Sequence, residues 1–163
     1  MSSTEPSRGP LKNLIPAVII TGLLAGALDA VAAITNFLVQ GGKNPASIFK
    51  YIASGVFGKK AFAGGLAMIA WGVFFHFLIT FGLTIFYYWL YPKVKWLGEN
   101  KIVAGLLYGI FAWVITTRVI VPLSRIPQPP FDLSKALVAI LILMCFIGLP
   151  ISLLANKHYL YKK

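Results

Sequence analysis

The chain has 163 residues, of which 58% are hydrophobic and only 12% are charged, and its formal net charge is +11. Soluble domains carry about 25% charged residues and about 45–50% apolar ones, so this composition excludes most soluble classes. It also excludes a typical nucleic-acid-binding protein, because too little polar sequence remains to form a water-exposed basic face. We therefore expect an integral membrane protein.

Charged residues divide the sequence into four long apolar segments. We predict transmembrane helices at residues 14–40, 65–91, 102–123 and 135–156, within a single membrane domain that covers residues 1–163. Each segment reaches the roughly 20 residues that a helix needs to cross the bilayer core. Strands of a membrane β-barrel would alternate apolar and polar residues, and the run at 136–144 does not alternate. The predicted fold is an all-α, four-helix transmembrane bundle.

The connection after the first span is expected to contain a short amphipathic helix at residues 45–58. Asn44-Pro45 is typical of a helix start, and apolar and polar residues then separate onto two faces. Such a helix is expected to lie at the membrane interface, where Lys50, Lys59 and Lys60 would meet lipid headgroups. Packing across the mouth of the bundle is the alternative, and the two arrangements are compatible.

The later connections and their aromatic residues complete the prediction. Asp132 or Ser134 is expected to cap the fourth helix. Tyrosines and a tryptophan gather where the second and fourth spans end, which is typical of the aromatic belts that anchor spans at the interface. These residues are Tyr87, Tyr88, Trp89, Tyr91, Tyr159 and Tyr161.

Four spans place both termini on one side of the membrane. That side carries eight basic residues, namely Arg8, Lys12, Lys93, Lys95, Lys101, Lys157, Lys162 and Lys163. The other side carries seven, namely Lys43, Lys50, Lys59, Lys60, Arg118, Arg125 and Lys135. The two counts hardly differ. Setting aside Arg118, which lies in a span, and the lysines of the surface helix favours cytoplasmic termini under the positive-inside rule.

Two small-residue motifs predict close helix packing. Gly22 and Gly26 form a GxxxG motif in the first span, and Gly105 and Gly109 form another in the third. In lipid, close approach at small residues is a main source of helix association. We expect these faces to look into the bundle, and they also offer an interface for a homo-oligomer.

Ionisable residues inside the spans are the candidate functional residues, because their burial in lipid is costly. His76 lies at the middle of the second span, and Asp29 and Arg118 lie roughly 4 Å and 9 Å from the middle toward the first loop. One hypothesis joins Asp29 to Arg118 with His76 and Thr80 nearby, as a site that handles protons or ions. The alternative makes His76 and Asp29 packing residues and lets Arg118 reach the headgroups. Arg118 projects away from the Gly105 and Gly109 face, so the three residues are not expected to meet at one point.

Signatures of catalysis are scarce. The chain has two histidines and one cysteine, without metal-ligand spacing or a phosphate-binding loop. We therefore expect no enzyme activity, no cofactor and no metal.

Several short motifs together resemble those of the YagU-like family of small bacterial inner-membrane proteins. They are Tyr91-Pro-Lys-Val-Lys95, Gly105-Leu-Leu-Tyr-Gly109, Pro122 and Pro129-Pro-Phe-Asp-Leu133, and Phe75-His76-Phe77 stands where that family has a central histidine. The resemblance covers roughly residues 76–133. It implies four spans and a bacterial plasma-membrane location, and it implies no activity.

Three hypotheses for function follow. The first is an oligomeric channel or transporter-like protein for protons, ions or a small solute, which uses Asp29 and His76. The second is an accessory or scaffold subunit of a larger membrane complex. The third is a lipid-interacting protein whose surface helix binds anionic headgroups. Membrane lipids are expected partners in each case, and nucleic acid is not.

Overall fold

The computed structural model describes residues 10–126 and 130–160, with side chains from residue 14 onward. The side chains of Arg8, Lys12, Tyr161, Lys162 and Lys163, which entered the predictions above, lie outside the described part, as does Pro129. The described residues form helices and turns, and no strand occurs among them.

Helices follow one another along the chain with short connections. Their bounds are α1 (Pro10–Val39), α2 (Ala46–Phe57), α3 (Lys60–Ala63), α4 (Leu66–Leu90), the 3-10 turn η1 (Tyr91–Lys93), α5 (Lys95–Glu99), α6 (Lys101–Ile115), the π-helical turn η2 (Thr116–Ile120), α7 (Val121–Leu123), α8 (Leu133–Leu143), the π-helical turn η3 (Met144–Gly148) and α9 (Leu149–Leu160).

Four of these helical stretches are long and apolar enough to cross a membrane. They are Leu14–Val39, Leu66–Lys93, Lys101–Leu123 and Leu133–Leu160. The four predicted spans are confirmed, and the fourth extends a few residues beyond its predicted end. Most of the apolar surface of each span faces outwards, as expected for helices in lipid. The chain is a multi-pass, all-helical membrane protein.

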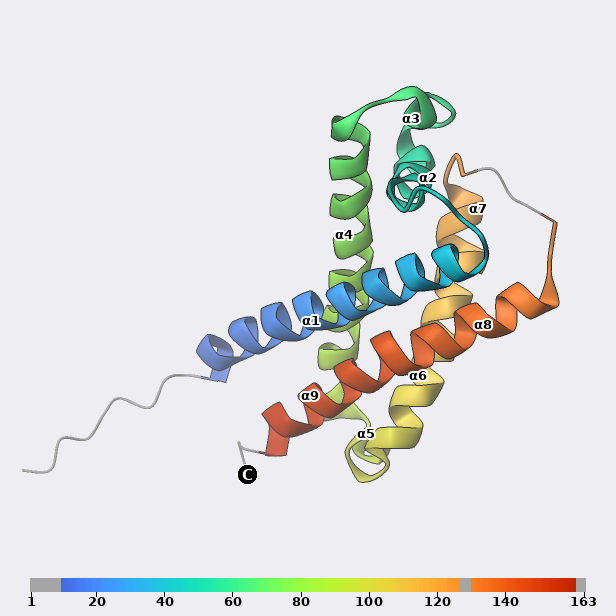
Figure 1. Cartoon of the computed structure of the whole chain (residues 1–163). Coiled ribbons are helices and arrows are strands. Elements are labelled where there is room, and N and C mark those ends of the chain that lie inside the picture. The colour runs from blue at the N-terminus through green and yellow to red at the C-terminus, as the bar shows by residue number, and fades with distance from the viewer. Residues whose placement is uncertain (1–9, 127–129, 161–163) are drawn as a thin grey trace, which may run out of the picture.

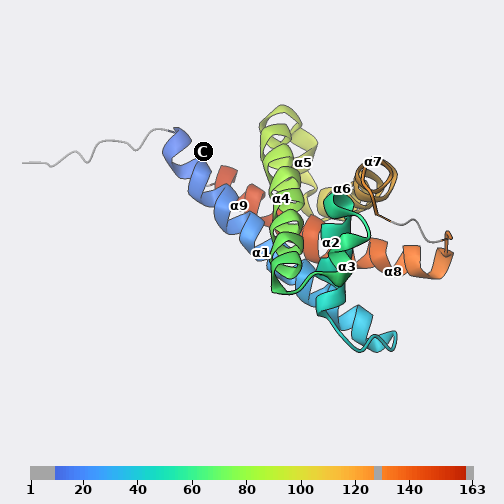
Figure 2. The same cartoon turned by 90° about the horizontal axis from the view of Figure 1, so that it is seen from above.

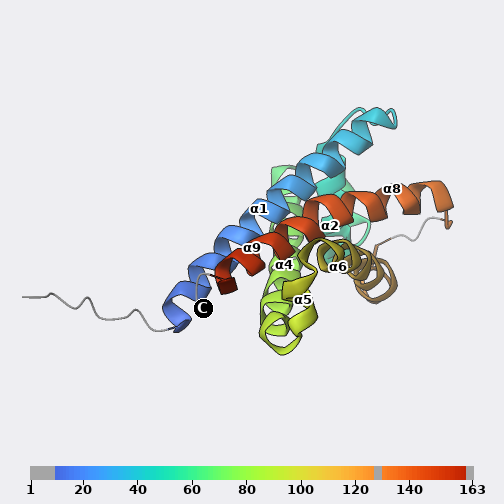
Figure 3. The same cartoon turned by 90° about the horizontal axis from the view of Figure 1, so that it is seen from below.

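The spans form two slanted pairs. In Figure 1, α1 and the α8–α9 helix run obliquely across α4 and α6, and α1 packs against both α4 and α9. The views from above and below (Figures 2 and 3) show α1 and α8 moving apart toward the end where α2 lies. The start of α1 and the end of α9 lie at the same end of the molecule, as four spans require.

Both GxxxG faces are buried inside the chain. A Cβ atom at Gly22 would overlap the Phe81 ring, and one at Gly26 would overlap the Phe77 ring, so α4 aromatic side chains fill the α1 motif. The second motif lies against η3, where a Cβ on Gly148 would meet backbone atoms of Gly105 and Gly109. Because neighbouring helices already cover these faces, they are not free to form an interface between copies.

Two π-helical turns interrupt the third and fourth spans. Val121 N donates to Thr116 O and Leu149 N donates to Met144 O, each across five residues instead of four. A proline follows each turn at the same offset, Pro122 after η2 and Pro150 after η3. Proline has no N–H and clashes with the carbonyl four residues earlier, so the helix widens just before it. The turns therefore change which side chains of these spans face the bundle.

The tyrosines at the end of α4 do not form an aromatic belt. Tyr87, Tyr88 and Tyr91 are only 0%, 3% and 9% exposed, so the interface prediction is wrong for them. Their hydroxyl groups find partners inside the protein, and Tyr87 OH donates to Ser152 Oγ at 2.7 Å. Trp89, on the opposite side of the helix, is exposed and carries Lys93 Nζ 3.1 Å from its ring centroid.

Candidate functional site

A cavity of about 230 Å³ lies among the helices at the end where α1 and α8 separate. Residues of α1, α2, α4, η2 and η3 contribute to its wall, together with residues adjoining them. The wall is mostly apolar, and Asp29 and His76 both belong to it. The complete lining is Asp29, Ala30, Ala33, Ile48, Phe49, Tyr51, Ile52, His76, Ile79, Thr80, Leu83, Thr116, Ile120, Val121, Ile126, Leu143 and Ile147.

The imidazole of His76 is fixed by one hydrogen bond. Its Nε2 lies 2.9 Å from the backbone oxygen of Gly26, and since a carbonyl oxygen only accepts, Nε2 carries the hydrogen. No hydrogen bond reaches Nδ1 from the described residues. In the neutral ring Nδ1 therefore keeps a lone pair that can accept a proton.

The carboxylate of Asp29 is partly buried and lies close enough to His76 to interact with it electrostatically. Among the described residues, no hydrogen-bond donor and no lysine or arginine pairs with this carboxylate. A carboxylate that faces a cavity without a protein partner is available to a proton or a ligand.

Threonine hydroxyl groups complete the polar part of the wall. Thr80 Oγ1 donates to His76 O at 3.1 Å, and both residues belong to the cavity wall. Thr84 Oγ1 donates to Thr80 O, but it lies outside the cavity. Thr116 differs from every other threonine in the described part of the chain, because its hydroxyl makes no hydrogen bond there. It is the first residue of η2, and it belongs to the cavity wall.

The short helix α2 closes one side of the cavity. Its apolar residues Ile48, Phe49 and Ile52 line the wall. The helix crosses α4 at Gly72, where a Cβ atom would overlap the backbone of Phe49. On its other side, Arg125 N donates to Gly55 O at 2.9 Å, which ties α2 to the residues after α7. The helix therefore packs on the bundle as the mouth-covering alternative requires.

The basic candidates lie away from the cavity. Arg118 is exposed and does not line it, so the structure does not bring Arg118 to Asp29. Lys59 and Lys60 are exposed at the start of α3, and Lys50 Nζ donates to Phe62 O at 3.4 Å.

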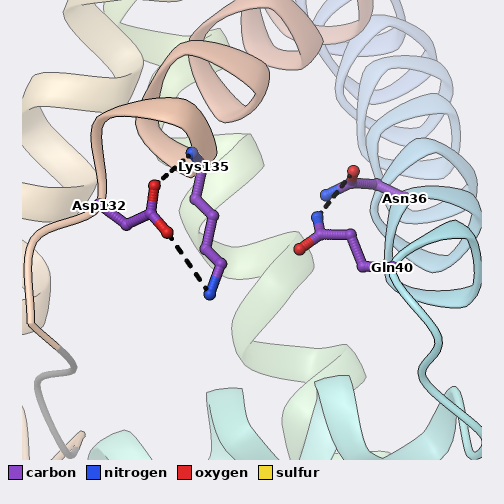
Figure 4. Close-up of polar contacts among 4 residues, drawn as sticks. All are labelled: Asn36, Gln40, Asp132 and Lys135. Atoms are coloured by element: carbon purple, nitrogen blue, oxygen red, sulfur yellow. Dashed lines mark hydrogen bonds and ion pairs between the residues drawn. The ribbon is translucent and has the colours of Figure 1, made fainter.

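Asp132 and Lys135 form an ion pair at the start of α8, with Lys135 Nζ 3.7 Å from Asp132 Oδ2 (Figure 4). Asp132 also caps that helix by accepting from Lys135 N, as predicted. The same view shows the exposed amide pair of Asn36 and Gln40 at the end of α1.

Sequence reasoning missed part of the site. It assigned no role to Thr116 or Tyr51, which both belong to the cavity wall. The two prolines that follow η2 and η3 were the available signal, because a proline inside a span predicts a local change of helix geometry.

Metal binding finds no support in the described residues. They contain no group of three or more histidine, cysteine, aspartate or glutamate side chains that could hold an ion.

No protein-family model matches this sequence, and comparisons with curated proteins and with solved structures give no match.

Proposed function

We propose that this protein is a small, non-enzymatic membrane transport protein that transfers protons, alone or together with a small solute, by way of the Asp29 and His76 cavity. The observation that carries the proposal is that these two ionisable side chains, from different spans, line one cavity of about 230 Å³. A dry, close-packed core around His76 would have favoured a purely structural role.

The chemistry of the pair supports proton transfer. The His76 ring can hold or release a proton at Nδ1, which has no hydrogen-bond partner among the described residues. Asp29 is the one acidic residue within the four described spans. A carboxylate within a span can take up and release a proton. Two groups that exchange protons at one cavity form the minimal relay for such transfer.

We further propose the setting in which this happens. Motifs that resemble the YagU-like family favour a bacterial plasma membrane, and the distribution of basic residues favours cytoplasmic termini. The exposed Lys59 and Lys60 would hold the α2 end of the molecule at anionic headgroups. Since one chain of four spans offers little room for a complete solute path, we propose a homo-oligomer in contact through lipid-facing surfaces other than the two GxxxG faces.

Proton flux into liposomes tests the proposal. The purified full chain is reconstituted into vesicles that contain a pH-sensitive dye, a pH gradient is imposed, and its decay is followed with the membrane potential held constant. We expect faster decay than in protein-free vesicles, and a return to the protein-free rate in Asp29→Asn and His76→Leu.

Asp132→Asn and Arg118→Gln are the matched controls. Asp132→Asn removes a carboxylate outside the cavity and keeps a residue that caps helices well. Arg118→Gln removes an ionisable residue of a span that does not line the cavity. Both controls should retain the wild-type rate. A wild-type rate equal to that of empty vesicles, or equal losses in Asp29→Asn and Asp132→Asn, would contradict the proposal.

A further inference from the structure

We infer that the cavity binds a small lipophilic ammonium ion, an aromatic or branched aliphatic primary amine of about the size of benzylamine, with the Asp29 carboxylate as its counter-ion. The inference deepens the proposed function, on which it rests, by naming the chemical class of the solute. It depends on the charge, the size and the chemistry of the cavity wall.

The charge of the wall favours a cation. Asp29 has no lysine or arginine partner among the described residues, and Arg118 does not line the cavity. The neutral imidazole can make the bond from His76 Nε2 to Gly26 O, so this bond does not require a charged histidine. An ionised Asp29 then leaves one negative charge in a largely apolar cavity, where electrostatic attraction is only weakly screened. A ligand with one positive charge neutralises it.

The size of the cavity favours an organic ligand over a proton alone. An engineered protein cavity of about 150 Å³ binds benzene. A cavity of about 230 Å³ therefore has room for an aromatic ring and a short side chain. Transfer of protons between Asp29 and His76 would need far less space.

The chemistry of the wall favours an organic ammonium ion over an inorganic cation. Hard cations such as Ca²⁺ take about 6–8 oxygen ligands. Among the described residues of the wall, only Asp29, Tyr51, Thr80 and Thr116 carry a side-chain oxygen, which is fewer oxygens than such a cation takes. Most of the wall is aliphatic or aromatic, which suits the hydrocarbon part of a lipophilic amine.

The polar residues of the wall supply hydrogen-bond acceptors for an ammonium head. A primary ammonium has three N–H donors and no acceptor, as in lysine. Asp29 offers a carboxylate that no protein donor occupies, and Thr116 offers a hydroxyl oxygen that makes no hydrogen bond in the described part of the chain. His76 Nδ1 is a further acceptor in the neutral ring. Asp29 and the neutral His76 ring thus add acceptors to a largely apolar wall, which fits a donor-only head group.

Calorimetric titration of the full chain in mild detergent tests the inference. Benzylamine is the probe, benzyl alcohol is its neutral analogue and benzoate is its anionic analogue, with empty micelles subtracted in each case. At neutral pH an aliphatic amine is protonated. We expect saturable binding of benzylamine at least tenfold tighter than that of benzyl alcohol, and no saturable binding of benzoate.

Two pairs of variants separate charge from space. Asp29→Asn should remove the tenfold preference for the amine over the alcohol, whereas Asp132→Asn should keep it. Ala33→Leu fills the cavity and leaves Asp29 and His76 unchanged, so it should weaken both ligands at least tenfold. Ala27→Leu adds the same side chain to an exposed position of α1 and should leave binding unchanged.

Each outcome is informative. Equal affinity for amine and alcohol, saturable binding of benzoate, or unchanged amine binding in Ala33→Leu would overturn the inference. Proton flux in vesicles without amine binding would leave the proposed function intact and remove only its solute. Amine binding without any flux of protons would retain the binding site and contradict transport.

Discussion

His76 Nε2 donates a hydrogen bond to the backbone oxygen of Gly26 at 2.9 Å and thereby joins the second span to the first. Gly26 also belongs to the GxxxG motif, and a side chain there would overlap the Phe77 ring. The close approach that lets α4 fill the glycine face of α1 also brings His76 to the Gly26 carbonyl. Packing and the candidate chemistry of Asp29 and His76 thus share one helix crossing.

Replacing His76 should lower stability as well as proton flux. His76→Leu removes the bond to Gly26 O, and hydrogen bonds between membrane helices contribute about 0.6 kcal/mol on average, up to about 1.7 kcal/mol. His76→Gln has an amide N–H that can replace the donor and should recover part of this loss. Unfolding of the purified protein by increasing denaturing detergent measures the difference. If His76→Leu is as stable as the wild type, the bond makes no net contribution.

Gly72 sets the distance between α2 and α4. In Gly72→Ala the new Cβ would overlap backbone atoms of Phe49, which can move only if α2 moves. Overpacking of this kind costs about 1–3 kcal/mol. Because Phe49 lines the cavity, amine binding should weaken together with stability. Thermal unfolding followed by circular dichroism, together with titration of benzylamine, measures both effects.

Gly82 provides the control for Gly72 in the same helix. A Cβ atom at Gly82 meets nothing within 4 Å. Alanine has the higher helix propensity by about 1 kcal/mol, so Gly82→Ala should leave stability unchanged or raise it. Similar losses in the two variants would show that glycine at position 72 is not required by the crossing.

Much of this architecture could be predicted from the sequence, because lipid imposes a simple rule on length and apolarity. The four spans, the short helix after the first of them and the Asp132 cap are in place. Asp29 and His76 were singled out as costly groups in lipid, and both line the cavity. The rule does not determine which side of a span faces the protein, because lipid and protein interior are both apolar.

The buried tyrosines show where that ambiguity matters. A tyrosine near a span end fits an interface belt and a buried hydrogen bond equally well in the sequence. What decides for Tyr87 is a partner 65 residues away, Ser152, which becomes its neighbour only when the fourth span packs on the second. The π-helical turn that begins at Thr116 likewise depends on local geometry before Pro122, which hydrophobic periodicity does not report.

Gly148 should be among the positions least tolerant of a side chain. A Cβ atom there would overlap Gly105 O and approach Gly109 N, both of them backbone atoms of α6. We expect Gly148→Ala to lower stability by about 2 kcal/mol or more, since the third and fourth spans would have to separate. The oligomeric state should not change, because this glycine contact lies within one chain. Light scattering in detergent and thermal unfolding check the two statements, and dissociation of an oligomer by Gly148→Ala would refute the second.

Asn156 joins the end of the fourth span to the connection between the second and third. Its Nδ2 donates to Tyr91 OH at 2.7 Å and to Gly98 O at 3.1 Å, and the side chain is only 3% exposed. Asn156→Leu keeps a similar volume and leaves the Gly98 carbonyl unpaired, which should cost about 1–3 kcal/mol. The near-ultraviolet circular dichroism of the tyrosines should change with it, because Tyr91 stacks on Tyr159 with ring centroids 4.8 Å apart.

Asn36→Leu is the control for Asn156→Leu. It removes an amide from the exposed pair with Gln40 and should change stability by less than about 0.5 kcal/mol. Equal losses in the two variants would show that the Asn156 bonds are no more important than a surface contact.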